Sequence, residues 1–265
     1  MSAATLRRVS LLDDLALAHE LADRADAVTL DRFRALDLRV ETKPDLTPVS
    51  DADTAVEQAL RAVLATRRPA DAVVGEEEGE TGDGPRRWVL DPVDGTKNFV
   101  RGVPVWATLV ALQVEGRVDV GVVSAPALGR RWWAARGHGA HAGAGAASGR
   151  PIAVSCVSAL ADASLSFAGL GSWGPRRAGL LQLTTEVWRT RSYGDFWAHM
   201  LVAEGAVDVS CEPEVSLWDL AAVQVVVEEA GGRFTDLGGI ARPDGGSAVA
   251  TNGLLHDAVL ARLGA

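Results

Sequence analysis

Apolar residues recur with helical period near the beginning of the chain and again after a short interruption. From Ser10 to about Leu36 they fall three or four positions apart, which predicts an amphipathic helix. Segment 41–49 contains prolines, so we expect a loop or extended chain there. The sequence from Ser50 to Asp53 resembles a capping box, with Asp53 in place of the usual Glu or Gln, and predicts the start of a second helix.

Short apolar runs of strand character then replace the helical period. In the first half, the predicted strands are 72–74, the run ending at Leu90, a hairpin of 105–114 and 118–124, and 131–135. In the second half, strands are predicted near 154, 189, 207–210, 233–234 and 249, and helices at 175–183, 196–203 and 218–230. An Ala/Gly/Ser stretch at 142–149 suggests halves 1–145 and 146–265 within one catalytic unit, 1–265. Strands mixed with helices imply stacked layers of sheet and helix.

Composition narrows the class of protein. With 26 basic and 35 acidic residues the formal net charge is −9, so we expect no nucleic-acid partner and no anionic membrane partner. Cys156 and Cys211 are the only cysteines, which argues against a disulfide framework and for a reducing compartment. Residues 1–12 lack a signal-peptide core, and no apolar run reaches spanning length. We therefore expect a cytoplasmic protein.

The most informative segment is Asp91-Pro92-Val93-Asp94-Gly95-Thr96, which follows an apolar run. Pro92 cannot donate a ladder hydrogen bond, so we expect it to end the strand. The carboxylates of Asp91 and Asp94 and the Val93 carbonyl can then face one point and offer hard oxygen ligands to Mg²⁺. The amides of Gly95 and Thr96 are available to an anion if a helix begins there. The segment predicts metal-dependent phosphate chemistry.

Two other interpretations of this segment compete with a metal site. An Asp-Gly pair alone is a common hairpin turn. Haloacid-dehalogenase phosphatases also carry paired aspartates, but theirs lie two positions apart, one being the nucleophile. In this chain the spacing is three and a proline intervenes, which favours the metal site.

Further candidate residues each have a plain structural explanation. Glu76 belongs to a run of glutamates that resembles a solvated loop, but it follows a strand and can point into the same cleft. Asp219 and Asp51 lie at predicted helix starts, where acids complement the helix dipole. Arg191 is compatible with a surface charge on a strand.

Considered together, these segments resemble the inositol monophosphatase superfamily of Mg²⁺-dependent, lithium-sensitive phosphatases over nearly the whole chain. The matching segments are 43–51, 75–77, 91–96, 191–194, 218–219 and 229–232. Within the superfamily, segments 97–104 and 192–196 look most like histidinol-phosphate phosphatases of actinobacterial type.

The resemblance implies an α+β or α/β fold, a layered α-β-α-β-α sandwich, and a homodimer. It implies about two or three Mg²⁺ ions per site. The implied metal ligands are Glu76, Asp91, the Val93 carbonyl, Asp94 and Asp219. The implied substrate contacts are Arg191, Asp195, Glu212, Asp94 and Asp219. Gly95 and Thr96 are implied to bind the phosphate. Lys43 and Asp45 are implied to contact the residues of the site rather than the substrate.

The implied mechanism follows from these ligands. Carboxylates gathered in one cleft repel each other unless cations lie between them. By analogy with the family, Thr96 and Asp51 form a hydroxyl–carboxylate pair that orients and deprotonates the attacking water, with Glu76 assisting. Metal ions stabilise the attacking and leaving oxygens, so no covalent phosphoenzyme is needed.

Asp195 and Lys97 depart from typical inositol monophosphatases. An acid at the pocket mouth suits a cation rather than a neutral polyol. With this acid, the resemblance to histidinol-phosphate phosphatases implies L-histidinol phosphate as the substrate. Alternatively, Asp195 caps the helix predicted from Phe196. The enzymatic alternative is an inositol-phosphate or other sugar-phosphate phosphatase, and the non-enzymatic one is a catalytically silent phosphate- or metal-binding module.

Overall fold

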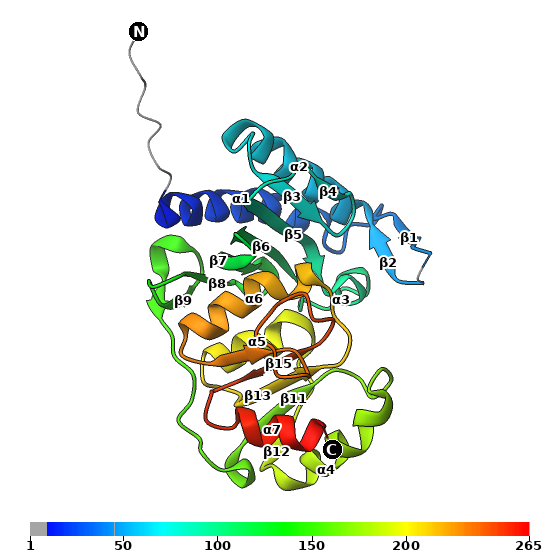
Figure 1. Cartoon of the computed structure of the whole chain (residues 1–265). Coiled ribbons are helices and arrows are strands. Elements are labelled where there is room, and N and C mark those ends of the chain that lie inside the picture. Colours follow the sequence, from blue (N-terminus) through cyan, green and yellow to red (C-terminus); the bar gives the residue numbers. More distant parts are fainter. Residues whose placement is uncertain (1–9, 45, 265) are drawn as a thin grey trace.

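The computed structural model describes residues 10–44 and 46–264 and consists of alternating layers of helix and sheet (Figure 1). Helices α1 and α2 cover the outer face of an eight-stranded sheet. Helices α5 and α6 lie between this sheet and a five-stranded sheet, whose outer face is covered by α4 and α7. The predicted α-β-α-β-α sandwich is confirmed.

The elements are short and closely spaced. The helices are α1 (Leu11–Arg32), α2 (Asp51–Arg67), α3 (Thr96–Val100), α4 (Arg177–Glu186), α5 (Asp195–Ala203), α6 (Leu217–Glu229) and α7 (His256–Leu263). The strands are β1 (Val40–Thr42), β2 (Pro48–Ser50), β3 (Ala72–Gly75), β4 (Gly79–Thr81), β5 (Arg86–Asp94), β6 (Ala107–Val114), β7 (Arg117–Ala125), β8 (Arg130–Ala135), β9 (Ala140–Gly143), β10 (Arg150–Pro151), β11 (Ser164–Phe167), β12 (Arg189–Thr190), β13 (Val209–Glu212), β14 (Arg233–Thr235) and β15 (Ala248–Thr251).

The two sheets differ in topology. The first has the strand order β10-β9-β8-β7-β6-β5-β3-β4 and is antiparallel except where β3 runs parallel to β5. The second has the order β12-β11-β13-β15-β14, and β11 pairs in parallel with both neighbours. Strands β1 and β2 form a separate hairpin at the edge of the molecule (Figure 1).

Three large apolar clusters hold the layers together. One lies between α1, α2 and the first sheet, the second between that sheet and α5 and α6, and the third beneath the second sheet. Small residues such as Ala18, Ala22 and Ala25 are fully buried on α1, which lets the helix approach the sheet closely. The predicted amphipathic stripe of α1 is confirmed by this burial.

Most predicted elements are present, and two predictions are wrong. No strand is described near Val154, where the Val154 amide donates to the Ala230 carbonyl instead. Pro92 does not end its strand, because β5 continues to Asp94. The first sheet also extends past the predicted division at residue 145, since β10 pairs with β9. Among the described residues, none of the helices has the length and apolar character needed to cross a membrane.

Candidate active site

An irregularity in strand β5 places two carboxylates at the head of the cleft. Asp91 pairs with Leu109 on β6, but Asp94 pairs with Ala107, so one extra residue is accommodated between them. The Pro92 carbonyl at this bulge accepts a 2.7 Å hydrogen bond from Thr108 Oγ1. A bulge reorients the side chains that flank it, and here it lets Asp91 and Asp94 face the same space.

Strand pairing brings Glu76 to the same point. Gly75 on β3 is in register with Leu90 on β5, so Glu76 follows β3 beside Asp91. The turn that begins at Glu76 is held by the buried Glu57 carboxylate, which accepts from the amides of Glu77 and Glu78 at 2.8 and 3.1 Å. A Cβ on Gly75 would lie 2.1 Å from Glu57 Oε1. A side chain at position 75 would therefore displace the Glu57 carboxylate that holds the turn.

Two helices begin with a Ser-x-x-Asp capping box whose aspartate also serves the cleft. At α6, the Ser216 amide donates to Asp219 Oδ2 at 2.6 Å. At α2, the Ser50 amide donates to Asp53 Oδ2 at 2.9 Å, and the second oxygen of Asp53 lies 3.2 Å from Thr96 Oγ1. One carboxylate oxygen thus fixes the helix start. The other is available to the site.

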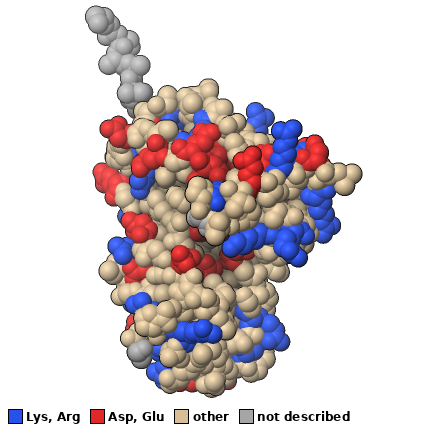
Figure 2. All heavy atoms as spheres, turned by 90° about the vertical axis from the view of Figure 1, so that its right-hand side faces the viewer, with Lys and Arg blue, Asp and Glu red and all other residues tan. Residues whose placement is uncertain are grey.

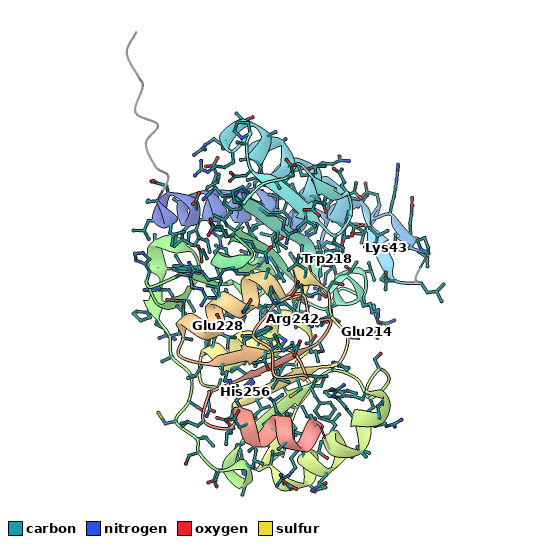
Figure 3. The ribbon with its side chains drawn as sticks, in the orientation of Figure 1. Lys43, Glu214, Trp218, Glu228, Arg242 and His256 are labelled. Carbon is teal, nitrogen blue, oxygen red and sulfur yellow. The ribbon has the colours of Figure 1, made fainter. Side chains whose placement is uncertain are left out.

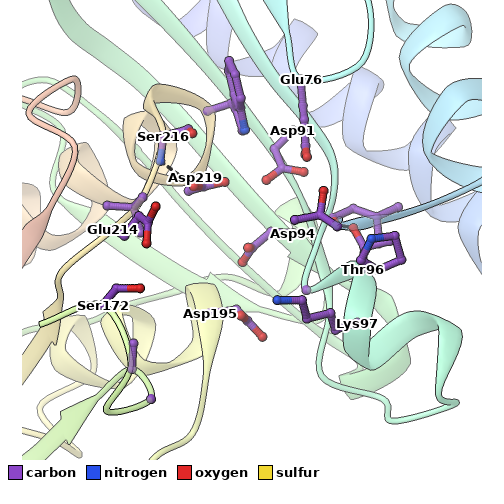
Figure 4. A pocket seen from close by; sticks show the side chains of 18 of the residues that line it. Glu76, Asp91, Asp94, Thr96, Lys97, Ser172, Asp195, Glu214, Ser216 and Asp219 are labelled. Carbon is purple, nitrogen blue, oxygen red and sulfur yellow. Dashed lines mark hydrogen bonds between the residues drawn. The ribbon is translucent and has the colours of Figure 1, made fainter. Parts of the chain in front are cut away.

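Asp91, Asp94 and Asp219 form a compact acidic cluster (Figure 4). Each offers a carboxylate oxygen, and these three atoms lie within 4.8 Å of one another. Asp91 is 1% exposed, and neither of its carboxylate oxygens has a hydrogen-bond partner among the described residues. Buried polar atoms without partners are costly, so this carboxylate is suited to accept a cation.

Burial and mutual repulsion raise the pKa of every acid in the cluster. The pKa of Asp91 lies well above its usual range because of burial and the charges of Glu76 and Asp94. The pKa of Asp94 is raised in the same way by burial and by Asp195. Burial raises the pKa of Asp219 to about 6. An all-oxygen donor set of this kind fits a hard divalent cation, whose charge would reverse these shifts.

The hydroxyl–carboxylate pair predicted for Thr96 exists, but with a different partner. Thr96 Oγ1 lies 3.2 Å from Asp53 Oδ1 and 3.0 Å from the Val93 carbonyl. Asp51, the predicted partner, forms an ion pair with Arg32 at 2.8 Å outside the cleft. Successive helical residues point about 100° apart, so Asp51 and Asp53 lie on nearly opposite sides of α2. The assignment of Asp51 to the site was wrong.

The segment after Asp94 turns sharply into a short helix. Gly95 adopts φ 83° and precedes α3, whose first residue is Thr96. A side chain at this glycine would lie 3.0 Å from the Val105 carbonyl and 3.2 Å from Asp195 Oδ2. Glycine satisfies both the positive φ and the close approach. Gly95, Thr96 and Val93 all line the cleft. Their phosphate and metal contacts stay predictions.

Lys43 reaches the acidic side of the cleft from the β1–β2 hairpin (Figure 3). Its Nζ lies 2.8 Å from Glu76 Oε1 and 2.7 Å from Glu77 Oε1. Burial alone would lower the pKa of Lys43, but these two hydrogen bonds raise it. Lys43 therefore neutralises part of the acidic cleft in the metal-free protein. Asp45, predicted to support the site with Lys43, lies outside the described residues.

Asp195 lines the cleft but does not cap its helix. Asp94 takes that role from β5, accepting from the Phe196 amide at 2.7 Å. Asp195 instead accepts from Asn98 Nδ2 at 2.9 Å. Burial and the nearby Glu212 raise the pKa of Asp195 to about 6, against the opposing effect of Lys97. The helix-cap alternative for Asp195 is wrong. The Asp195 side chain forms part of the lining of the cleft.

The two remaining predicted substrate contacts, Arg191 and Glu212, do not line the cleft itself. Arg191 is exposed, donates to the Thr190 carbonyl at 2.7 Å, and is not among the residues that line the cleft. Glu212 lines a smaller chamber that adjoins the cleft. Two residues that the sequence reasoning missed do line the cleft. Glu214 lies two positions after Glu212, whereas the sequence offered no signal for Ser172.

The complete cleft has a volume of about 620 Å³ and is bounded by loops from both halves of the chain. Figure 2 shows acidic side chains gathered in the hollow between the upper and lower parts of the molecule. Lysines and arginines lie on the surface near its rim (Figure 2). The cleft can therefore hold cations at its floor and an anionic ligand above them.

Comparisons with known proteins agree with this geometry. The model of the inositol monophosphatase family matches residues 11–264. The chain belongs to the inositol monophosphatase family. A solved inositol monophosphatase from Zymomonas mobilis is 31% identical, with a TM-score of 0.84 and coverage of 97% of this chain and 100% of that one.

Two curated members of the family are closer in sequence. A histidinol-phosphatase of Streptomyces coelicolor is 60% identical over 95% of this chain and 97% of its own length. A histidinol-phosphatase of Mycobacterium tuberculosis is 61% identical over 96% of this chain and 98% of its own length.

Proposed function

We propose that this protein is a Mg²⁺-dependent histidinol-phosphatase, which hydrolyses L-histidinol phosphate to L-histidinol and phosphate in histidine biosynthesis. The observation that carries the proposal is the Asp195 carboxylate in the cleft wall, next to the acidic cluster. A neutral polyol gains little from a carboxylate there, whereas a cationic leaving group gains a charge-assisted hydrogen bond. The names of the relatives at 60% and 61% identity support the same substrate.

In the proposed mechanism, the residues that would hold the metal ions are Glu76, Asp91, Asp94, Asp219 and the Val93 carbonyl, all of which line the cleft. Bound Mg²⁺ would neutralise the phosphate and stabilise the charge that develops on the attacking and leaving oxygens. Thr96 Oγ1 accepts a proton from the attacking water while donating its own to Asp53. The water oxygen forms a bond to phosphorus as the ester P–O bond breaks. The departing alkoxide takes up a proton from a solvent water, and Asp53 returns its proton to solvent.

The rest of the cleft positions the substrate in this proposal. The amides of Gly95 and Thr96, at the start of α3, hold the phosphate. Asp195 accepts a hydrogen bond from the cationic side of the leaving group, and Asn98 fixes the orientation of its carboxylate. Arg191 has no part in this arrangement. The homodimer and the cytoplasmic location expected from the sequence stay predictions.

The proposal is tested with a panel of phosphomonoesters assayed side by side in Mg²⁺. We expect L-histidinol phosphate to give a kcat/KM at least roughly tenfold above inositol 1-phosphate and glycerol 2-phosphate, the value of one charge-assisted contact. A preference for inositol 1-phosphate would favour the polyol-phosphate alternative. Absence of phosphate release from every ester would favour the silent binding module.

A further inference from the structure

A small chamber adjoins the cleft between α5 and the start of α6. It has a volume of about 160 Å³, against about 620 Å³ for the cleft. The two spaces share Asp94, Asp195, Glu214 and Asp219 in their walls. Figure 4 shows Asp195, Glu214 and Asp219 arranged around Asp94. The chamber and the cleft are therefore adjacent, with side chains of these acids facing both spaces.

The chamber combines acidic and apolar walls. Beyond the shared acids it is lined by Glu212, and no lysine or arginine is present among its described lining residues. Phe196, Val215 and Leu220 supply apolar surface. Acidic groups alternating with apolar ones suit a flat ring that carries N–H groups, because the faces of the ring are apolar and its edge donates hydrogen bonds.

His199 is the observation that points to a ligand. It lies one helical turn after Asp195 on α5 and lines the chamber. It is 1% exposed, and neither ring nitrogen has a hydrogen-bond partner among the described residues. Its Nε2 lies 3.5 Å from Glu212 Oε1, and its ring packs against Phe234. A buried imidazole that makes no hydrogen bond is costly unless something entering the chamber supplies one.

We propose that this chamber binds the imidazole ring of the leaving group, with Glu212 and His199 each pairing with one ring nitrogen. The inference rests on the proposed function. At about 30 Å³ per water, about 160 Å³ accommodates a five-membered ring but not the whole amino alcohol. The ammonium group then lies at the chamber mouth between Asp195 and Glu214, and the phosphate stays in the cleft. His199 and Glu214 become determinants of substrate specificity.

The test uses the full-length Mg²⁺-loaded protein and esters that separate ring from ammonium. L-Histidinol phosphate carries both groups, phosphoethanolamine carries only the ammonium, and glycerol 2-phosphate carries neither. We expect His199→Leu to lower kcat/KM for histidinol phosphate roughly tenfold, mainly through KM, and to leave the other two esters within about twofold. Glu214→Gln should lower kcat/KM roughly tenfold for both ammonium-bearing esters and leave kcat/KM for glycerol 2-phosphate unchanged.

A matched control and a binding measurement complete the design. Asp244→Asn removes one exposed charge from a residue that does not line the chamber, and it should leave kcat/KM unchanged for all three esters. Calorimetric titration should detect binding of L-histidinol to the wild type and at least roughly tenfold weaker binding to His199→Leu.

The possible results separate the two proposals. Suppose that wild type prefers histidinol phosphate but that His199→Leu and Glu214→Gln lower kcat/KM equally for all three esters. The chamber inference is then wrong, and the proposed function stands. If wild type shows no preference for histidinol phosphate, the proposed function itself fails. If His199→Leu melts at a temperature well below that of wild type, the measurements are repeated with His199→Gln, which keeps a polar side chain at this position. In that case, an unchanged discrimination between histidinol phosphate and phosphoethanolamine in both variants would overturn the ring assignment.

Discussion

Two buried aspartates in this molecule have opposite surroundings. Asp14, on α1, is fully buried, and its Oδ1 accepts from Arg68 at 3.0 Å and from Arg86 at 2.9 Å. Asp91, on β5, is 1% exposed and faces Asp94 and Asp219 rather than any arginine. The first charge is neutralised by the protein itself, whereas the second has only other acids beside it.

The difference distinguishes a structural ion cluster from a ligand site. A buried carboxylate whose charge is balanced by its own arginines gains little from an added cation, and removing a partner costs stability. A buried carboxylate among other acids destabilises the folded chain until a cation arrives, and the binding energy of that cation is then available to the reaction. The predictions below test this contrast.

The largest effect is expected for Asp94→Asn, which removes one charge from the acidic cluster. Because metal binding contributes several kcal/mol of transition-state stabilisation, we expect kcat to fall at least roughly 10³-fold. The variant should melt no lower than the metal-free wild type, since repulsion is relieved and the asparagine oxygen still accepts from the Phe196 amide. Phosphate release and thermal melting check both parts. Substantial wild-type turnover in excess chelator would contradict the metal mechanism.

A matched pair of substitutions compares the two aspartates directly. Asp14→Asn strips the charge that holds Arg68 and Arg86, so we expect the free energy of unfolding to fall by about 2–3 kcal/mol, with kcat unchanged. Asp91→Asn should leave metal-free stability unchanged or higher and abolish turnover. Denaturant titration of the metal-free proteins measures both. Equal destabilisation by the two changes would show that Asp91 has a partner of its own.

Asp195→Asn probes an acid that lies between these extremes. The carboxylate accepts a hydrogen bond from Asn98 but does not cap α5. The free energy of unfolding of the variant should therefore stay within about 0.5 kcal/mol of the wild-type value. Loss of a charge-assisted hydrogen bond should lower kcat/KM for histidinol phosphate roughly ten- to a hundredfold. Glycerol 2-phosphate, whose leaving group is neutral, serves as the control. An equal loss on both esters would argue against recognition of a cation.

The smallest effect concerns pH. Asp195 and Asp219 have folded-state pKa values of about 6, raised from 3.8 chiefly by burial. The folded protein therefore holds more protons than the unfolded chain between about pH 4 and 6, and their contribution to stability grows as pH falls through that window. Mg²⁺ relieves the same repulsion, so saturating Mg²⁺ should stabilise the protein by about 1 kcal/mol more at pH 7.5 than at pH 5.

The comparison with and without Mg²⁺ removes an opposing contribution. Burial lowers the pKa of His19 and of His256 to about 4, so these histidines destabilise the fold as pH falls below 6.5. Both effects are the same with and without metal and cancel in the difference. A Mg²⁺-induced stabilisation that is independent of pH would show that the metal does not displace protons from the cluster.

The sequence by itself determined the local parts of this protein. The spacing of Asp91 and Asp94 around Pro92, the capping box at Ser50 and the stripe of α1 are properties of neighbouring residues, and each is present in the structure. Local periodicity also predicted the β6–β7 hairpin and the helices between the two sheets.

Only the tertiary structure decided which side chains meet across the cleft. Asp51 and Asp53 differ by two positions, and the packing of α2 on the sheet turns Asp53 toward Thr96 and Asp51 toward Arg32. Arg191 donates to the neighbouring Thr190 carbonyl and lines neither space, while His199 and Glu214 line the chamber from separate parts of the chain. Such pairings depend on how whole helices and strands are oriented, and a rotation of about 100° per helical residue makes a neighbouring position a different surface of the molecule.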